Sequence, residues 1–234
     1  MLKKVTIRPV TNKIALDNKK STFDVNNLFF ITTSNFIIIF FLKSSNDIIN
    51  SGGMYMIAAI IMDNGFEELE AMGPIALLRR AGIQVDVIRV EGNEVTGRFN
   101  VTYSPSILFS EYDFSKADCL ILPGGPHYQK LKKNKDVLSL IHEFAKKKVL
   151  AAICASPTIL GQEGILKGKK YTCFKELDED FGGEYQYQYV VTDGNIITGI
   201  SAAASIDFAY AIIEKLLGKE KCDQVKASIY WDAR

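Results

Sequence analysis

The sequence predicts an α/β fold in which an open, mostly parallel sheet carries helices on both faces. Apolar runs of strand length alternate with amphipathic helical patterns from residue 56 onward, and this alternation is typical of parallel sheets covered on both sides. Several of the runs contain no polar residue, as expected for strands that are buried on both faces. With 234 residues, 47% of them hydrophobic and 24% charged, the chain can form one sizeable core. One main domain is therefore expected.

Charge and cysteine usage argue against several classes of function. The 28 basic and 27 acidic residues give a net charge of +1, so we expect neither a nucleic-acid footprint nor an acidic partner. The four cysteines form no CxxC pair and there are only two histidines, which argues against a zinc or other metal site. Free thiols are typical of a reducing compartment, so we expect the protein in the cytoplasm.

Residues 1–55 differ in kind from the rest of the chain. They are rich in Lys, Asn, Ile, Phe, Ser and Thr, and their apolar run at 28–42 is interrupted by four polar residues. The run is shorter than the ~20 apolar residues of a membrane span and lacks the features of a signal peptide. We expect an extension outside the main domain at 56–234. Three interpretations stay open: a disordered or mis-assigned upstream stretch with the true start at Met54 or Met56, a leader or weak membrane anchor, and an ordered added element.

The first strand is predicted at 56–62, where seven apolar residues precede the turn sequence Asp63-Asn-Gly65. A dinucleotide-binding domain would place a glycine-rich phosphate loop here, whereas this chain continues with three glutamates in FEELEA at 66–71. Carboxylates at that point argue against a bound nucleotide. The first two glutamates suit the first turn of a helix. Glu70 lies one turn further along, where its side chain can point back over the strand ends.

The remaining elements follow from the same two periodicities. Gly73-Pro74 is expected to interrupt the first helix, which resumes at 75–81 and ends at Gly82. The final long helix is expected to be capped by Ser201 and closed by Gly218. Strands are predicted at 83–90, near 94–95 and 101–103, and at 118–122, 149–153 and 170–174, with a hairpin of 187–191 and 195–198 around Asp193-Gly194, and helices at 136–147 and 219–226.

Three separate features point to one edge of this sheet. The strand at 149–153 ends at Cys154 and Pro157 opens a helix just after it, so the thiol is expected near the positive end of a helix dipole, which lowers a thiol pKa. Such a thiolate is a nucleophile; the alternative is a small buried apolar residue. The Gly124-Gly125 turn either presents N–H groups to a ligand or is an ordinary tight turn. Since ligands of open α/β sheets bind at the carboxyl ends of strands, Glu70, this turn and Cys154 predict one crevice.

Five motifs occur in a characteristic order and spacing: GFEELE at 65–70, LRRAG at 78–82, LPGG at 122–125, AAICA at 151–155 and GKE at 218–220. Together they resemble the ThiJ/PfpI superfamily of class I glutamine amidotransferase-like proteins, and within it the branch of the parkinsonism-associated deglycase. The resemblance covers about residues 56–230 and implies a flavodoxin-like three-layer sandwich and a homodimer. Residues 1–55 lie outside the family's pattern.

The resemblance also implies a site and an activity. It implies a reactive Cys154 held by Glu70, with oxyanion-type N–H groups from Gly125 and Ala155. Family members are described as glyoxalases that convert methylglyoxal to lactate without a cofactor, as deglycases, redox sensors and chaperones, and some relatives as amidases or proteases. We therefore expect a cofactor-independent glyoxalase or deglycase whose substrate is a small reactive aldehyde or a glycated adduct. The alternatives are a non-enzymatic redox sensor or chaperone that works through Cys154 oxidation and, more weakly, an amidase or protease.

Two departures from the family's pattern affect these expectations. The family often supplies a histidine near the cysteine, and the corresponding positions here are Ala155 and Phe174. His127, which follows the glycine turn, is an auxiliary candidate for that role, the alternative being a plain loop histidine. The glycine-rich turn before the last helix is replaced by ISAAA at 200–204, which leaves the pocket wall and the substrate open. Cys119 and Cys173 are interpreted as buried strand residues.

Overall fold

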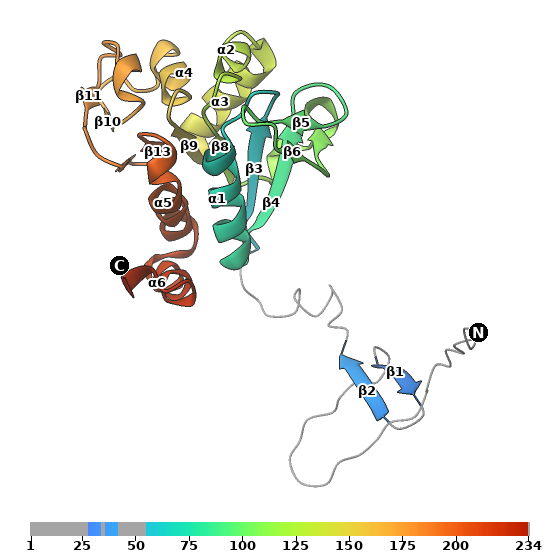
Figure 1. Ribbon diagram of the computed structural model, residues 1–234. Coiled ribbons are helices and arrows are strands. Elements are labelled where there is room, and N and C mark those ends of the chain that lie inside the picture. The colour runs from blue at the N-terminus through green and yellow to red at the C-terminus, as the bar shows by residue number, and fades with distance from the viewer. Residues whose placement is uncertain (1–27, 34–35, 42–54, 234) are drawn as a thin grey trace. The chain divides into compact units, whose positions relative to one another are not determined.

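The structure, a computed structural model, describes residues 28–33, 36–41 and 55–233. The chain divides into two compact units, Met1–Met54 and Tyr55–Arg234. In the first unit, β1 (Leu28–Thr33) and β2 (Phe36–Phe41) pair antiparallel (Figure 1). The hypotheses of a start at Met54 or Met56, a leader or a disordered stretch concern residues that lie mostly outside those described. None of the described helices has the length and apolar character that crossing a bilayer requires.

The second unit is built on a seven-stranded sheet with the order β12-β13-β9-β8-β3-β4-β7. All neighbouring strands are parallel except β12 and β13, which form the predicted antiparallel hairpin. Two small sheets lie outside it, one antiparallel and one parallel. The strands of the main sheet are β3 (Ile57–Met62), β4 (Gln84–Arg89), β7 (Ile107–Leu108), β8 (Cys119–Leu122), β9 (Val149–Ile153), β12 (Val190–Asp193) and β13 (Ile196–Gly199), and those of the small sheets are β5 (Val95–Thr96) with β6 (Thr102–Tyr103) and β10 (Lys170–Tyr171) with β11 (Glu184–Tyr185).

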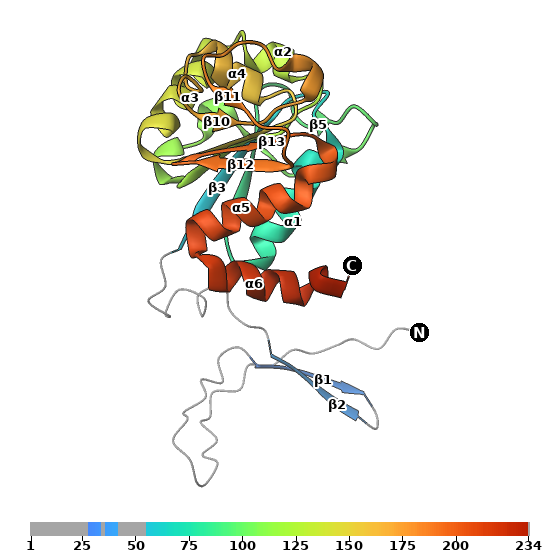
Figure 2. The ribbon, with the colours of Figure 1, turned by 90° about the vertical axis from the view of Figure 1, so that its left-hand side faces the viewer.

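Helices cover both faces of the main sheet, which confirms the predicted three-layer architecture. Ile60 and Ile61 are adjacent in β3 and belong to different core clusters, because alternate side chains of a strand face opposite ways. One cluster contains buried residues of α1 (Glu68–Arg80), α5 (Ser205–Leu217) and α6 (Lys219–Ser228), and the other those of α2 (Tyr128–Leu131), α3 (Lys135–Lys147) and α4 (Pro157–Gln162). Figures 1 and 2 show α1 and α5 side by side against the sheet. Short 3₁₀ helices occur at Phe109–Glu111, Phe114–Lys116, Lys175–Leu177, Ala202–Ala204 and Trp231–Ala233.

The predicted interruption of the first helix is wrong, because α1 runs unbroken through Pro74. The steric restriction that proline places on the preceding residue arises partly from a clash with that residue's Cβ. Here the preceding residue is Gly73, which has none. A Cβ at Gly73 would lie 3.3 Å from the Cβ of Ser205 at the start of α5. Glycine therefore serves two purposes here: it relieves the helix before Pro74 and lets α1 approach α5.

Two further elements differ from the prediction. Ser201 makes no side-chain cap; a 3₁₀ turn at Ala202–Ala204 precedes α5, and Ser205 Oγ donates to the Ala202 carbonyl at 2.7 Å. The strand predicted at 170–174 is only two residues long, and it pairs with β11 outside the main sheet. The closure of α5 by Gly218 is confirmed, with φ +85° at that residue.

Candidate active site

The three features predicted to meet at one edge of the sheet do lie together. Cys154 follows β9, the Gly124-Gly125 turn follows β8, and Glu70 lies in the first turn of α1, after β3. Strand β8 is the middle one of these three strands. The turn at its end therefore lies between Glu70 and Cys154, and it touches both: a Cβ on Gly124 would be 2.5 Å from Glu70 Oε2 and 2.6 Å from Cys154 Cβ.

Cys154 occupies a strained backbone conformation at the end of its strand. Its φ is +64°, in the left-handed region that residues other than glycine rarely adopt. Its N–H donates to the Gly199 carbonyl at 2.9 Å, and its own carbonyl accepts the Phe174 N–H at 2.9 Å. Two neighbouring segments therefore hold the backbone in this conformation. The Cys154 side chain lines a cavity.

Glu70 is a buried carboxyl group beside this thiol. The residue is 1% exposed, and its Oε2 accepts the Gly124 N–H at 2.9 Å. Burial raises the pKa of Glu70 to about 7, because desolvation outweighs the opposing hydrogen bonds from Cys154 and Gly124. Glu70 is thus able to exchange a proton near neutral pH.

Burial also raises the pKa of the Cys154 thiol, and the negative charge of Glu70 adds to this effect, whereas the N–H groups of Ala155 and Gly125 oppose it. The prediction that a helix dipole lowers the pKa of Cys154 is therefore wrong, because the opposing effects are larger. The helix α4 begins three residues later and has only six residues, so its dipole is small and distant. Once Glu70 is protonated its charge no longer opposes the thiolate, and the two acids titrate as a coupled pair.

Both residues of the Gly124-Gly125 turn must be glycine, because a Cβ at either position would collide with neighbouring atoms. Gly125 has φ +96°, and a Cβ there would lie 2.6 Å from the Glu67 nitrogen and the Gly65 carbonyl oxygen. The Gly125 N–H faces the Cys154 thiol, while the Gly124 N–H donates to Glu70 Oε2. The hydrogen bond between the Gly124 N–H and Glu70 was not predicted, although the Gly-Gly pair in the sequence indicated that backbone N–H groups could be presented here.

A cavity of about 220 Å³ opens beside the thiol. Arg98 is a lining residue that sequence reasoning missed. The loop that carries it is held by Glu68, whose Oε1 accepts the Phe99 N–H at 2.6 Å. The predicted dipole role of Glu68 therefore leaves out its main contact. The cavity is lined by Arg98, Gly125, Pro126, Tyr128, Cys154, Ala155, Phe174 and Leu177.

His127 does not line this cavity. It is 1% exposed, and both ring nitrogens bind backbone groups: Nδ1 accepts the Asp63 N–H at 3.1 Å, and Nε2 lies 2.9 Å from the Pro123 carbonyl, to which it donates in the matching tautomer. Burial lowers the pKa of His127 to about 4. The ring is therefore neutral, and both of its nitrogens already have backbone partners. His127 is not placed to take the role of the histidine that the family often supplies near the cysteine.

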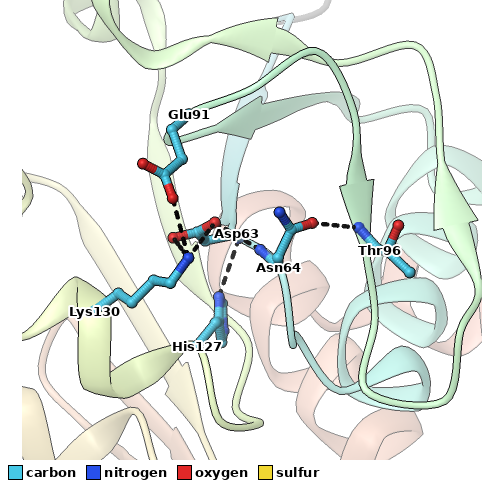
Figure 3. A network of polar contacts seen from close by, with 6 residues as sticks. All are labelled: Asp63, Asn64, Glu91, Thr96, His127 and Lys130. Atoms are coloured by element: carbon cyan, nitrogen blue, oxygen red, sulfur yellow. Dashed lines mark hydrogen bonds and ion pairs between the residues drawn. The ribbon is translucent and has the colours of Figure 1, made fainter.

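Figure 3 shows the polar network behind the turn, to which His127 belongs. The Lys130 ammonium lies between two carboxylates, 3.4 Å from the buried Asp63 and 3.0 Å from Glu91. Asn64 Oδ1 accepts the Thr96 N–H at 2.9 Å. The network ties the loop after β3 to α2 and to β5.

Neither a metal-ligand cluster nor a second partly exposed thiol occurs among the described residues. Within 55–233 and the two short strands described before it, no three His, Cys, Asp or Glu side chains lie close enough to hold a metal ion. Cys119 and Cys173 are both buried free thiols, as predicted. Cys119 lies in β8, whereas the prediction of a strand at Cys173 is wrong, because β10 ends at Tyr171. Cys154 is the partly exposed thiol among the four.

Comparison with known proteins identifies the family. The model of the DJ-1/PfpI family matches residues 56–215. The Parkinson disease protein 7 homolog of Danio rerio is 35% identical over 180 residues, 74% of this chain and 95% of that protein. A protein of Thermococcus kodakarensis named as a deglycase is 31% identical over 147 residues, 61% of this chain and 89% of that protein.

A solved structure supports the same conclusion. DJ-1beta of Drosophila melanogaster is 33% identical over 177 residues, 72% of this chain and 93% of that protein. Its crystal structure superposes with a TM-score of 0.71 at 31% identity, covering 76% of this chain and 98% of the other. The seven-stranded sheet, the order of the motifs and these similarities agree, and the chain belongs to the DJ-1/PfpI family.

Proposed function

We propose that the protein is a cysteine-dependent glyoxalase or deglycase that acts on methylglyoxal-type α-oxoaldehydes or their adducts. The observation that carries the proposal is the pair formed by the buried Glu70 and the partly exposed Cys154, in which the pKa of the carboxyl group is raised to about 7. A relative named as a deglycase supports the same reaction class. The catalytic roles below are assigned to Cys154, Glu70, Gly125 and Ala155.

The first step is proton transfer within the pair. A thiol beside a carboxylate and a thiolate beside a carboxylic acid carry the same net charge, so moving the proton from Cys154 to Glu70 costs no additional buried charge. The thiolate is the nucleophilic form. The N–H groups of Ala155 and Gly125 stabilise it.

In the second step the thiolate attacks the aldehyde carbon of the substrate. A C–S bond forms, and the carbonyl π electrons move to oxygen. The resulting oxyanion of the hemithioacetal is held by the backbone N–H groups of Gly125 and Ala155. The Gly124-Gly125 turn and the strained backbone at Cys154 keep these groups in place before the substrate binds.

The third step is an internal redox rearrangement. Glu70 first gives the proton that it took from the thiol to the hemithioacetal oxyanion, which regenerates its carboxylate. The carboxylate then removes the hydrogen of the former aldehyde carbon as a proton and returns it to the neighbouring carbon, while the hydroxyl proton of the first carbon moves to the oxygen of the second, so that the first carbon is oxidised and the second reduced. The product is a thioester of Cys154, which water hydrolyses to a 2-hydroxy acid and the free thiol. The sequence consumes one water and no external oxidant or reductant.

A redox role is the second candidate. If Cys154 is oxidised to a sulfinate, the protonated Glu70 is positioned to donate a hydrogen bond to it. Amide hydrolysis has less support, because a Cys-His pair is its usual machinery and the cavity residues within the described chain include no histidine.

The test measures methylglyoxal consumption and the D- and L-lactate formed by the full chain. Lactate formation is expected for the native sequence and for Cys222→Ala, whose buried thiol lies in α6, and is expected to disappear in Cys154→Ser. Absence of lactate from folded protein with a reactive thiol would refute the glyoxalase and shift the weight to redox sensing.

We also propose, from the family resemblance, that the protein is a cytoplasmic homodimer. Light scattering at micromolar concentration measures the mass in solution, for which the monomer is 26.1 kDa. Cell fractionation tests the compartment. A monomer, or a protein confined to the membrane fraction, would contradict the respective part of this proposal.

A further inference from the structure

The cavity beside Cys154 is bordered mainly by apolar side chains. Pro126 and Tyr128 come from the turn after β8 and the start of α2, and Phe174 and Leu177 come from the segment after β10. Phe174 is 37% exposed, and the other three are partly or fully accessible. Accessible apolar surface around a cavity favours an apolar ligand that covers it.

The lining of the cavity also contains a few polar groups. Cys154 and the neighbouring backbone N–H groups form the reactive end. Arg98 is the one charged side chain among the described residues that line the cavity, and its guanidinium lies over the Phe99 ring, 4.9 Å from the centroid. The phenol of Tyr128 is the only other polar side-chain group of this lining apart from the thiol. A substituent that carries several hydroxyl groups would therefore find few side-chain hydrogen-bond partners in this lining for the water that it loses.

The size of the cavity exceeds what the smallest substrates need. Its volume is about 220 Å³. If one heavy atom takes the ~30 Å³ that a water molecule occupies in the liquid, the five heavy atoms of methylglyoxal fill about two thirds of this space. At the same allowance, the eight heavy atoms of 4-methyl-2-oxopentanal, in which isobutyl replaces methyl, need about 240 Å³, which is slightly more than the volume of the cavity.

We infer that the cavity selects α-oxoaldehydes, free or as adducts, whose substituent is a branched aliphatic or aromatic group, and that Phe174 and Leu177 contact this substituent. The inference rests on the proposed function and names its substrate class. The reaction is unchanged: the aldehyde carbon bonds to the Cys154 sulfur, and one water is consumed as R–CO–CHO becomes R–CH(OH)–COOH. Only the group R differs from methylglyoxal.

Steady-state kinetics of the full chain with three substrates tests this. Methylglyoxal, 4-methyl-2-oxopentanal and the polyhydroxylated 3-deoxyglucosone are compared through the 2-hydroxy acid that each forms. We expect kcat/KM to be about tenfold higher for the isobutyl compound than for methylglyoxal, chiefly through a lower KM, because each additional buried methylene contributes a few-fold. We expect 3-deoxyglucosone, which is larger but hydrophilic, to fall below methylglyoxal.

Two variants locate the preference. Phe174→Ala is expected to reduce the isobutyl-to-methyl ratio of kcat/KM about fivefold, since it removes apolar surface from the cavity wall. The matched control is Tyr189→Ala, which removes an aromatic ring that is 58% exposed and does not line the cavity. This control is expected to leave the ratio unchanged.

The outcomes separate the inference from the function on which it rests. Equal or better turnover of methylglyoxal, best turnover of 3-deoxyglucosone, or a ratio unaffected by Phe174→Ala overturns the inference and leaves the proposed function intact. If no aldehyde yields a 2-hydroxy acid, the proposed function itself fails. Should Phe174→Ala not fold, the three-substrate comparison of the native sequence still decides.

Discussion

The reactive end of the cavity and its mouth are built from different kinds of structure. Cys154 and Gly124 lie at the ends of two neighbouring parallel strands, where the backbone is held by sheet hydrogen bonds and one added methyl group would collide with reactive atoms. Phe174 and Leu177 lie in a segment between two short strands outside the main sheet. The comparison indicates that small changes at the reactive end remove the chemistry, whereas changes at the mouth alter the choice of substrate.

Two carboxylates on the same helix sharpen this comparison. Glu68 and Glu70 are both buried in the first turn of α1. Glu68 binds the backbone of the loop that carries Arg98, while Glu70 binds the Gly124 N–H beside the thiol, and burial raises its pKa to about 7. One carboxylate therefore has a structural contact, and the other is available for proton transfer.

The largest expected effect is that of Glu70→Gln on turnover. The amide can still accept the Gly124 hydrogen bond but cannot carry a proton, so we expect kcat to fall about 10²- to 10⁴-fold. Glu68→Gln is the matched control, because its amide oxygen can still accept the Phe99 N–H; a loss of less than about tenfold is expected. Equal losses in the two variants, measured by lactate formation, would show that proton transfer is not the role of Glu70.

Gly124→Ala is expected to lower kcat about 10²-fold. The new Cβ would lie 2.5 Å from Glu70 Oε2 and 2.6 Å from Cys154 Cβ, so the pair must separate, and small misplacements of reacting groups are costly. In Gly164→Ala, whose φ is +73° with nothing within 4 Å of a Cβ, only stability should decrease, by about 1 kcal/mol. Unchanged kcat in a folded Gly124→Ala protein would contradict the assigned geometry.

The raised pKa of Glu70 also predicts how stability depends on pH. Folding raises this pKa from 4.5 to about 7, so between these values the folded state binds more protons than the unfolded state, and its stability falls as pH rises. Glu70→Gln should therefore be more stable than the native sequence at pH 8 by about 3 kcal/mol, and the difference should disappear near pH 4. Denaturant unfolding at both pH values measures it, and a difference that does not depend on pH would refute the assignment.

The smallest expected effect compares the two histidines. His127→Leu leaves the buried Asp63 N–H without its acceptor, which costs about 1–3 kcal/mol of stability, and His127→Asn, which keeps an acceptor, should recover part of it. His142→Leu removes a partly exposed pair with Glu163 at 2.8 Å, worth less than about 1 kcal/mol. Equal losses for His127→Leu and His142→Leu, measured by chemical denaturation, would show that the network behind the turn is not a stabilising element.

The hydrophobic pattern of the sequence predicted the strands and helices well, but it did not predict how individual helices begin or whether they continue through a proline. The five-residue apolar run of β9 and the amphipathic pattern of α3 were readable because a strand or helix repeats its pattern over its length. The continuity of α1 through Pro74 was not predicted, because proline usually interrupts a helix and the pattern did not show that Gly73 accommodates it here. The absence of a cap at Ser201 depends on the 3₁₀ turn that precedes α5.

The candidate site divides in the same way. The sequence by itself determined that Cys154, Glu70 and the glycine turn would meet, because parallel strands direct their carboxyl ends to one edge. Only the tertiary structure decided that the pKa of the partly buried Cys154 thiol is raised, that both ring nitrogens of His127 bind backbone groups, and that Arg98 and Phe174 line one cavity. Desolvation, hydrogen-bond partners and cavity walls come from residues distant in sequence, and no local pattern records them.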